Sequence, residues 1–249
     1  MKKYKYVVVS GCSFSASDAV NLIDSGETYG DLIAKQFEAK FYNLAQSGGS
    51  VEYVNRTILE WCGKNKDKFE DTLFILGMPH LDRWTVWSNK TKQWVNINIG
   101  FLSDRGLDDH FYSFNNKKIT NFAKNCWNEN EQLRRTINTI VGLQSFFKVN
   151  NIDSVFFDAS IESIGEYYKW CDENEFGEQY SNKLLWDSLI KTEYWYQHPK
   201  YRGFIDLTRN NVDMRVDQKK WPGDLHPNVK AHKYWAKCLM EFIDEKINT

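Results

Sequence analysis

The sequence lacks the features that mark most cofactor, metal and nucleic-acid proteins. Its 249 residues carry a net charge of −1 without any block of like charge, which argues against a nucleic-acid binder. No Walker loop, dinucleotide-binding fingerprint or HExxH motif occurs. The five cysteines are widely spaced and form no Cys-x-x-Cys pair of the kind that binds zinc or carries out redox chemistry. We therefore expect no cofactor, no metal and no nucleic-acid partner.

Long apolar segments are also absent. No run approaches the roughly 18 apolar residues of a membrane-spanning helix. The basic N-terminus turns polar at Ser10, too early for the apolar region of a secretory signal peptide. Internal repeats and low-complexity linkers are missing as well. We expect a cytoplasmic protein without a membrane partner, in which residues 1–249 form a single domain.

The first eighty residues alternate between two apolar patterns. Short apolar runs at residues 4–10, 40–44 and 72–76 predict buried strands, and apolar positions at helical spacing predict helices at 29–38 and 51–62. Strands that alternate with helices are typical of a parallel sheet with helices on its faces. The fold class predicted from this part of the chain is therefore α/β.

The rest of the chain is less regular. Residues 84–99 predict a β-hairpin, 130–148 a long helix, 153–158 a further strand and 228–247 a closing helix. We treat residues of about 84–125 and 160–203 as insertions into the domain. The second insertion is rich in Trp and Tyr, and its part at 167–201 is expected to wall a substrate cleft.

Polar loops follow the predicted strands directly. Ser13 comes after the first strand, Gly48 after the second and His80 after the third, so these loops should meet at the carboxyl edge of the sheet. His226 lies in the loop that opens the last helix. A serine on a strand-to-helix turn and a histidine brought from a distant loop are the minimum for nucleophilic catalysis, because a serine hydroxyl needs a base to take its proton.

These loops resemble, in chain order, the sequence blocks of the SGNH (GDSL-like) hydrolases. Residues 8–15 resemble the block around the nucleophile, with Cys12 where the family usually has Asp, residues 43–48 resemble the second block, and residues 224–228 the last. The resemblance spans nearly the whole chain and implies a three-layer, flavodoxin-like fold with a central parallel sheet. The amino-acid sequences of these blocks are most similar to those of uncharacterised SGNH-like proteins of tailed phages. This resemblance would place the protein in a host cell or on a virion.

The resemblance also implies roles for individual residues. Ser13 would be the nucleophile, His226 its general base, and the backbone N–H groups of Ser13 and Gly48 oxyanion donors. The implied activity is hydrolysis of a small-molecule or carbohydrate ester, such as an O-acyl sugar, through an acyl-Ser13 intermediate.

Two positions depart from the family pattern. The third block normally reads Gly-x-Asn-Asp, and Pro79 stands where its Asn oxyanion donor belongs, although proline has no N–H to donate. His80 is the candidate to supply that donor, with Arg83 as the fallback, and an oxyanion hole built on backbone donors alone is the remaining alternative. The family's acid lies three residues before the histidine, which here is Gly223, whereas Asp224 lies two before it. Either Asp224 or a backbone carbonyl would therefore orient the imidazole of His226.

Several alternatives stay open at this point. Ser10 and Ser15 compete with Ser13 for the role of nucleophile, and His232 is interpreted as a structural residue. The same machinery would serve an O-acyltransferase. A binding or virion-associated module that kept the fold and lost the chemistry is the second hypothesis, with Pro79 as its best support. The sequence does not specify an oligomeric state.

Overall fold

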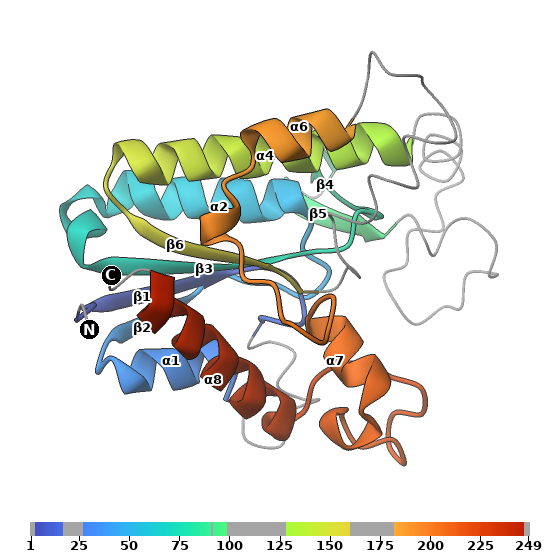
Figure 1. Ribbon diagram of the computed structural model, residues 1–249. Helices are drawn as coiled ribbons and strands as arrows, with labels where there is room; N and C mark the ends of the chain where they lie inside the picture. The colour runs from blue at the N-terminus through green and yellow to red at the C-terminus, as the bar shows by residue number, and fades with distance from the viewer. Residues whose placement is uncertain (1–2, 17–26, 91, 99–127, 160–181, 247–249) are drawn as a thin grey trace.

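A parallel sheet of four strands forms the centre of the protein, seen here in a computed structural model that describes residues 3–16, 27–90, 92–98, 128–159 and 182–246 (Figure 1). The strands are β1 (Tyr6–Ser10), β2 (Lys40–Asn43), β3 (Thr72–Met78) and β6 (Asp153–Asp158), in the order β2-β1-β3-β6. This is the flavodoxin-like order, in which the second strand lies outside the first. The predicted α/β class and parallel sheet are confirmed.

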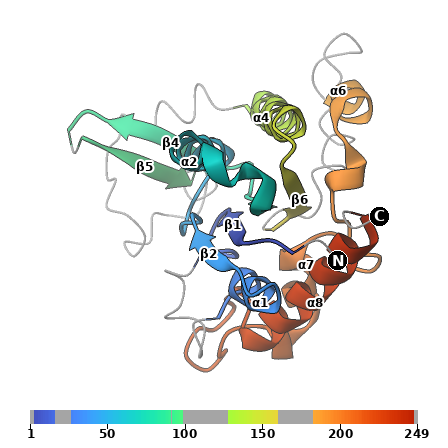
Figure 2. The same ribbon diagram turned by 90° about the vertical axis from the view of Figure 1, so that its left-hand side faces the viewer.

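Helices cover both faces of the sheet (Figures 1 and 2). Helices α1 (Tyr29–Gln36) and α8 (Val229–Lys246) lie on one face, and α2 (Val51–Lys64) and α4 (Glu129–Val149) on the other. Successive strand residues point to opposite faces, so each strand supplies both cores. Val8 packs with the α2 and α4 side, and its neighbours Val7 and Val9 pack with α1 and α8. The three layers expected from the family resemblance are confirmed.

The C-terminal half of the chain adds short elements around this frame. They are α6 (Asn182–Leu189), α7 (Phe204–Asn210) and the 3-10 turns η4 (Thr192–Tyr194) and η5 (Val212–Met214), and a further 3-10 turn, η2 (Lys66–Asp71), precedes β3. Trp195 forms a parallel bridge to Phe156 of β6, and the N–H of Tyr196 donates to the Phe156 carbonyl at 2.7 Å. This segment therefore continues the sheet for one bridge beyond β6.

Aromatic side chains of residues 182–201 are part of the core. Trp186, Trp195, Tyr196 and Tyr201 are each at most 9% exposed and pack in the two apolar clusters on either face of the sheet. The prediction that they wall a substrate cleft is wrong, because their rings are used to cover the sheet. The part of that prediction that concerns residues 167–181 lies outside the described residues.

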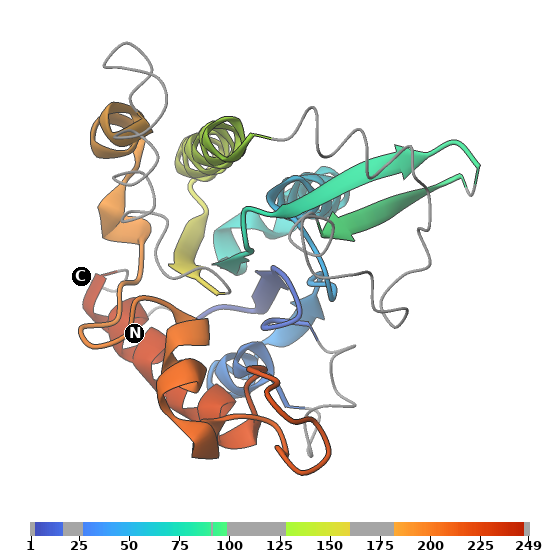
Figure 3. The ribbon, with the colours of Figure 1, turned by 90° about the vertical axis from the view of Figure 1, so that its right-hand side faces the viewer.

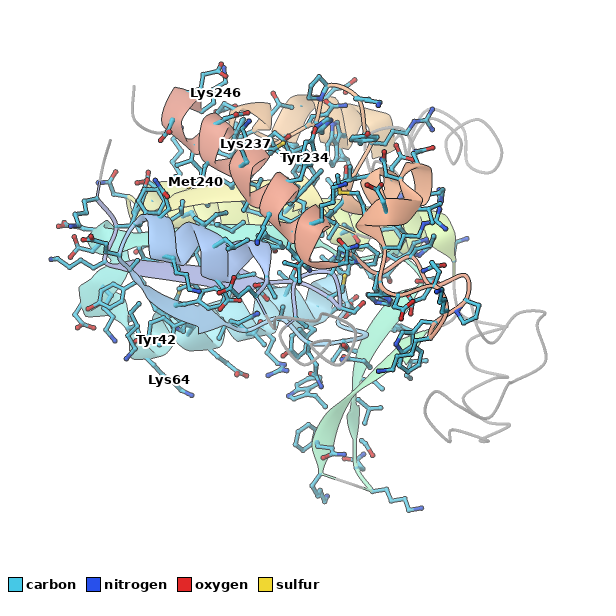
Figure 4. All side chains as sticks on the ribbon, turned by 90° about the horizontal axis from the view of Figure 1, so that it is seen from below. Tyr42, Lys64, Tyr234, Lys237, Met240 and Lys246 are labelled. Atoms are coloured by element: carbon cyan, nitrogen blue, oxygen red, sulfur yellow. The ribbon has the colours of Figure 1, made fainter. Side chains whose placement is uncertain are left out.

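The hairpin predicted at residues 84–99 is present as β4 (Arg83–Ser88) and β5 (Gln93–Asn98). It projects from the body of the molecule beside α2 (Figures 3 and 4). Thr85 pairs with Asn96, and Trp87 with Trp94. The remainder of the first expected insertion lies outside the described residues. Among the described helices, none combines the length and the apolar composition needed to cross a bilayer.

Candidate active site

Ser13 lies in a tight turn directly after β1. The N–H groups of Ser15 and Ala16 both donate to the Cys12 carbonyl, at 2.8 and 2.9 Å, and close the turn around Ser13. Gly11 allows the turn to press on β3, since a Cβ at Gly11 would lie 2.8 Å from the Gly77 carbonyl oxygen. The strand end and the glycine together therefore fix where the Ser13 hydroxyl points.

The two competing serines have structural partners. Ser15 is fully buried, and its Oγ accepts a hydrogen bond from the Tyr29 hydroxyl at 2.8 Å. Ser10 is also fully buried, and its Oγ lies 3.1 Å from Thr57 Oγ1 of α2. Of the three serines, Ser13 is the one whose hydroxyl contacts a histidine.

His226 joins Ser13 to an acid. His226 Nε2 lies 2.8 Å from Ser13 Oγ, and His226 Nδ1 lies 2.6 Å from Asp224 Oδ1. Both distances are within direct hydrogen-bond reach. With an ionised Asp224, the ring proton sits on Nδ1, which leaves Nε2 free to accept the Ser13 proton. The Phe14 ring stacks on the imidazole with centroids 5.1 Å apart, so the ring plane is held from a third direction.

Asp224 contacts the imidazole despite its unusual spacing from it. Gly223 has a φ of +77°, a left-handed backbone that side-chain-bearing residues adopt only with strain. The acid is placed one residue later, where Asp224 Oδ1 also accepts the backbone N–H of His226 at 2.7 Å. Because Asp224 reaches the ring directly, no backbone carbonyl is required to orient it.

The charge on Asp224 is stabilised in place. Burial alone would raise the pKa of this carboxyl, but the hydrogen bonds and the positive charge available from His226 outweigh it and hold the pKa below its usual value. Asp224 is therefore ionised at neutral pH. An ionised acid keeps the imidazole in the tautomer that a base needs.

The loop that carries His226 is tied to the segment before it. The N–H of Val216 donates to the His226 carbonyl at 3.0 Å, and Asn228 Nδ2 donates to the Arg215 carbonyl at 2.7 Å. Asn228 Oδ1 accepts the N–H of Ala231 at 3.1 Å and so caps the first turn of α8. His226 is therefore held just before the capped start of α8 by hydrogen bonds to residues 215 and 216.

The loop of the second block lies against the Ser13 turn. Asn43 Nδ2 donates to the Ser15 carbonyl at 2.9 Å, and the N–H of Gln46 donates to the Gly11 carbonyl at 3.3 Å. A Cβ at Gly49 would lie 2.8 Å from that same Gly11 oxygen. Gly48 takes a φ of +76° within this loop. The first and second blocks thus meet at the carboxyl edge of the sheet.

The third block places a histidine beside a carboxylate. Pro79 follows β3 and is buried, and His80 Nδ1 lies 2.7 Å from Asp82 Oδ1, with the His80 side chain 43% exposed. The backbone N–H of Asp82 donates to His80 Nδ1 at 3.3 Å, so a neutral ring that accepts there carries its proton on Nε2 and can donate from that atom. Arg83 has its Nε and Nη1 buried, and neither atom has a hydrogen-bond partner in the described part of the chain.

An open depression of about 510 Å³ lies between α2 and the hairpin. The Trp94 side chain is 46% exposed, and the Arg56 guanidinium lies 5.1 Å from the centre of its ring. The depression combines an aromatic face with carboxylate, amide and hydroxyl groups, and its lining consists of Glu52, Asn55, Arg56, Leu59, Glu60, Thr85 and Trp94.

His232 lies on α8 and is fully buried. Its Nδ1 accepts the backbone N–H of Tyr29 at 3.2 Å. Burial, with a smaller contribution from the charge of His226, lowers the pKa of His232 to about 3, so the ring is neutral in the folded protein. This agrees with a structural role. Across the described ranges, no group of three or more His, Cys, Asp or Glu side chains is arranged to hold a metal ion.

The sequence did not single out Asn96 and Asp82, which the structure brings to the edge of this region. A Cβ built on Gly48 would lie 3.7 Å from the Asn96 Cβ, and Asp82 pairs with His80. The alternation within β5 predicts that Asn96 shares a face with Trp94. It does not reveal that this face turns toward Gly48, because that depends on how the hairpin docks on α2.

A family described as "Family of unknown function (DUF6071)" matches residues 16–178 of the chain. The chain belongs to this family. The matched range excludes both Ser13 and His226, so membership in the family does not by itself assign the site. A search of the curated proteins finds no match.

Solved structures of esterases share the fold over nearly the whole chain. Esterase EstA from Pseudoalteromonas sp. gives a TM-score of 0.52 at 10% identity and covers 98% of this chain and 100% of its own. TesA gives 0.51 at 10% identity, with 96% and 97% covered. The acetyl xylan esterase Est2A from the rumen bacterium Butyrivibrio proteoclasticus gives 0.50 at 9% identity, with 100% of this chain and 66% of its own covered.

The fold is that of the SGNH hydrolases, as the sequence blocks predicted. None of the proteins described above is named as a phage protein. The resemblance to tailed-phage sequences stays a prediction.

Proposed function

We propose that the protein is a serine esterase that works through an acyl-Ser13 intermediate. The observation that carries this proposal is the continuous contact from Ser13 Oγ to His226 Nε2, at 2.8 Å, and from His226 Nδ1 to Asp224 Oδ1, at 2.6 Å. Activation of a serine requires a base in contact with its hydroxyl and an acid that orients the base, and these contacts supply both. The esterases that share the fold supply independent support.

In the acylation step, Ser13 Oγ attacks the ester carbonyl carbon and its proton passes to His226 Nε2. The carbonyl oxygen becomes an oxyanion, for which the N–H groups of Ser13 and Gly48 are the proposed donors. The intermediate then collapses, the C–O bond to the leaving alcohol breaks, and the alcohol oxygen takes the proton from Nε2. Asp224 stays ionised throughout and stabilises the imidazolium.

Deacylation repeats these transfers with water. His226 Nε2 takes a proton from a water molecule as its oxygen attacks the acyl carbon, and the same proton returns to Ser13 Oγ when the acid leaves. If a sugar hydroxyl takes the place of water, the same groups perform acyl transfer. The two activities therefore differ in the acceptor that the cleft admits, and the composition of the products distinguishes them.

The substrate we propose is an O-acyl carbohydrate. The depression beside the hairpin offers the flat ring of Trp94 together with the carboxylates of Glu52 and Glu60, which suit the apolar faces and hydroxyl groups of a sugar. One neighbour in fold is an acetyl xylan esterase.

One observation favours a second candidate, a binding module without catalysis. Pro79 occupies the place of the third oxyanion donor, so an important contribution to transition-state stabilisation is missing from its usual position. In that case the Ser13–His226 contact would be a remnant, and the protein would bind esters or sugars without turning them over.

A fluorophosphonate label decides between these candidates without knowledge of the substrate. We expect the reagent to modify Ser13, located by mass spectrometry of the labelled peptide, because only an activated hydroxyl attacks phosphorus at a useful rate. The Ser13→Ala variant should take up no label, whereas Ser15→Ala should still be labelled if it folds. Absence of label from the wild-type protein, or labelling at another residue, would contradict the esterase proposal.

A further inference from the structure

The candidate oxyanion hole lacks its usual third donor in the third block. Pro79 has neither a donor side chain nor a backbone N–H. The loss of one such donor costs about a hundredfold or more in kcat in enzymes of this kind. The inference below rests on the proposed esterase function and concerns where the chain replaces this donor.

Asn96 lies beside Gly48 on the side where a side chain would project from that residue. Among the described residues, the Asn96 Cβ, at 3.7 Å, is the one atom within 4 Å of a Cβ built on Gly48, apart from the adjacent residues. Gly48 is the proposed donor of the second block. An amide carried on β5 therefore stands next to the backbone that would hold the oxyanion.

The register of the hairpin explains why Asn96 is there. Thr85 pairs directly with Asn96, and Trp87 with Trp94, so these four side chains lie on one face of the two-stranded sheet. Thr85 and Trp94 both line the depression beside α2. The face that carries Asn96 is thus the face turned toward α2 and the second block.

The Asn96 amide is held through Thr85. Thr85 Oγ1 donates to Asn96 Oδ1 at 2.7 Å. Thr85 Oγ1 also lies 2.7 Å from Ser50 Oγ, and the Ser50 hydroxyl donates to Glu52 Oε2 at 2.6 Å. Ser50 is the N-cap of α2 and accepts the N–H of Tyr53 at 3.3 Å. The amide oxygen therefore contacts a hydroxyl that lies beside the N-cap of α2, two residues after Gly48, and the amide nitrogen has no hydrogen-bond partner within the described residues.

We propose that Asn96 Nδ2 is the third oxyanion donor, supplied by the hairpin in place of the third block. The amide donates a hydrogen bond to the oxyanion while keeping both protons, so the step adds no atom or charge to the mechanism. A neutral amide does so at every pH at which His226 is a base.

Substitution of Asn96 tests this role through the separation of kcat from KM. With p-nitrophenyl acetate, Asn96→Ala should lower kcat about a hundredfold and leave KM nearly unchanged, since the contact forms only in the transition state. Asn96→Asp should be about tenfold worse again, because a carboxylate oxygen would then face the oxyanion. The control is Asn89→Ala, at the exposed turn of the same hairpin, which should keep wild-type kinetics.

A transition-state analogue separates donation from a merely structural role. Asn96→Ala should weaken binding of a trifluoromethyl ketone inhibitor by the same factor as kcat/KM, with the melting temperature of the protein unchanged. Wild-type kcat in Asn96→Ala, or equal kcat in the Ala and Asp variants, would overturn the role of Asn96 while leaving the esterase function intact. A wild-type protein that neither hydrolyses esters nor takes up fluorophosphonate would overturn both.

Discussion

The two sides of the candidate site are built differently. On one side, buried hydrogen bonds join the turn that carries Ser13 to the helix that follows His226, since Tyr29 donates from its hydroxyl to Ser15 and from its backbone to His232. On the other, the hairpin presents its side chains to solvent, with Trp87 and Trp94 each nearly half exposed. Proton transfer depends on distances of a few tenths of an ångström, whereas recognition of a leaving group tolerates a more adaptable surface.

The largest effect should come from the buried side. His226→Ala should lower kcat for a model ester by about 10⁵ or more, because the base transfers the proton itself. Asp224→Asn should lower it by about 10⁴, since the Asn oxygen can still accept the backbone N–H of His226 but no longer fixes the imidazole tautomer. Steady-state kinetics on the purified variants measure both.

A different order of these effects would change the assignment. Unchanged turnover in His226→Ala would show that another group is the base. An Asp224→Asn variant as active as the wild type would mean that the backbone contacts of the loop orient the imidazole without the acid. Thermal melting of both variants controls for loss of the fold.

Apolar periodicity and the family blocks together predicted most of the buried side. The strand predicted at 72–76 is β3 (Thr72–Met78), and the closing helix predicted at 228–247 is α8 (Val229–Lys246), because both follow from apolar periodicity alone. Ser13 and His226 were proposed from their blocks, and the structure places them in contact. The reach of Asp224 could not be read from spacing, since it depends on the left-handed backbone of Gly223.

The exposed side was less predictable for a physical reason. The hairpin itself follows from its alternating pattern, but its docking on α2 is a long-range contact between Thr85 and Ser50. The placement of Asn96 beside Gly48 depends on that docking and has no local signal. In the same way, Trp186 and Trp195 were expected at a cleft and lie in the core, because composition does not reveal which surface an aromatic side chain covers.

The buried side should also respond to acid. The pKa of His232 is near 3 in the folded protein and near 6.5 when exposed, so below pH 6.5 the unfolded chain binds the extra proton. The contribution of the neutral His232 ring to the free energy of unfolding is therefore fully present above pH 6.5, and it decreases as the pH drops from 6.5 toward 3. Between pH 7 and 4.5 this residue should account for a loss of about 3 kcal/mol in the free energy of unfolding.

Urea denaturation at the two pH values measures this loss. The His232→Asn variant has no titrating ring, so its free energy of unfolding should fall by about 3 kcal/mol less than that of the wild type over the same pH interval. The readout is the difference between the two proteins in how far the free energy of unfolding falls from pH 7 to pH 4.5, and not their stability at pH 7. If the free energy of unfolding falls by the same amount in both proteins between the two pH values, His232 is not the cause of the loss of stability in acid.

The smallest of these effects, and the one that tests the exposed side, concerns Trp94. Its ring lines the depression and extends the face that carries Asn96, so we expect it to stack on the sugar of an O-acetylated oligosaccharide. Trp94→Ala should raise KM for such a substrate about tenfold, which corresponds to about 1.4 kcal/mol of lost binding. The constants for p-nitrophenyl acetate should not change, because that substrate has no sugar to place there.

Two further variants make this expectation specific. Trp94→Phe keeps an aromatic face and should recover most of the affinity for the acetylated sugar. Trp87→Ala removes an equally exposed ring that does not line the depression, and its KM should stay near that of the wild type. If Trp94→Ala impairs both substrates alike, the ring supports the fold of the hairpin. If it impairs neither, the leaving group is bound elsewhere, and the exposed side then serves the oxyanion alone.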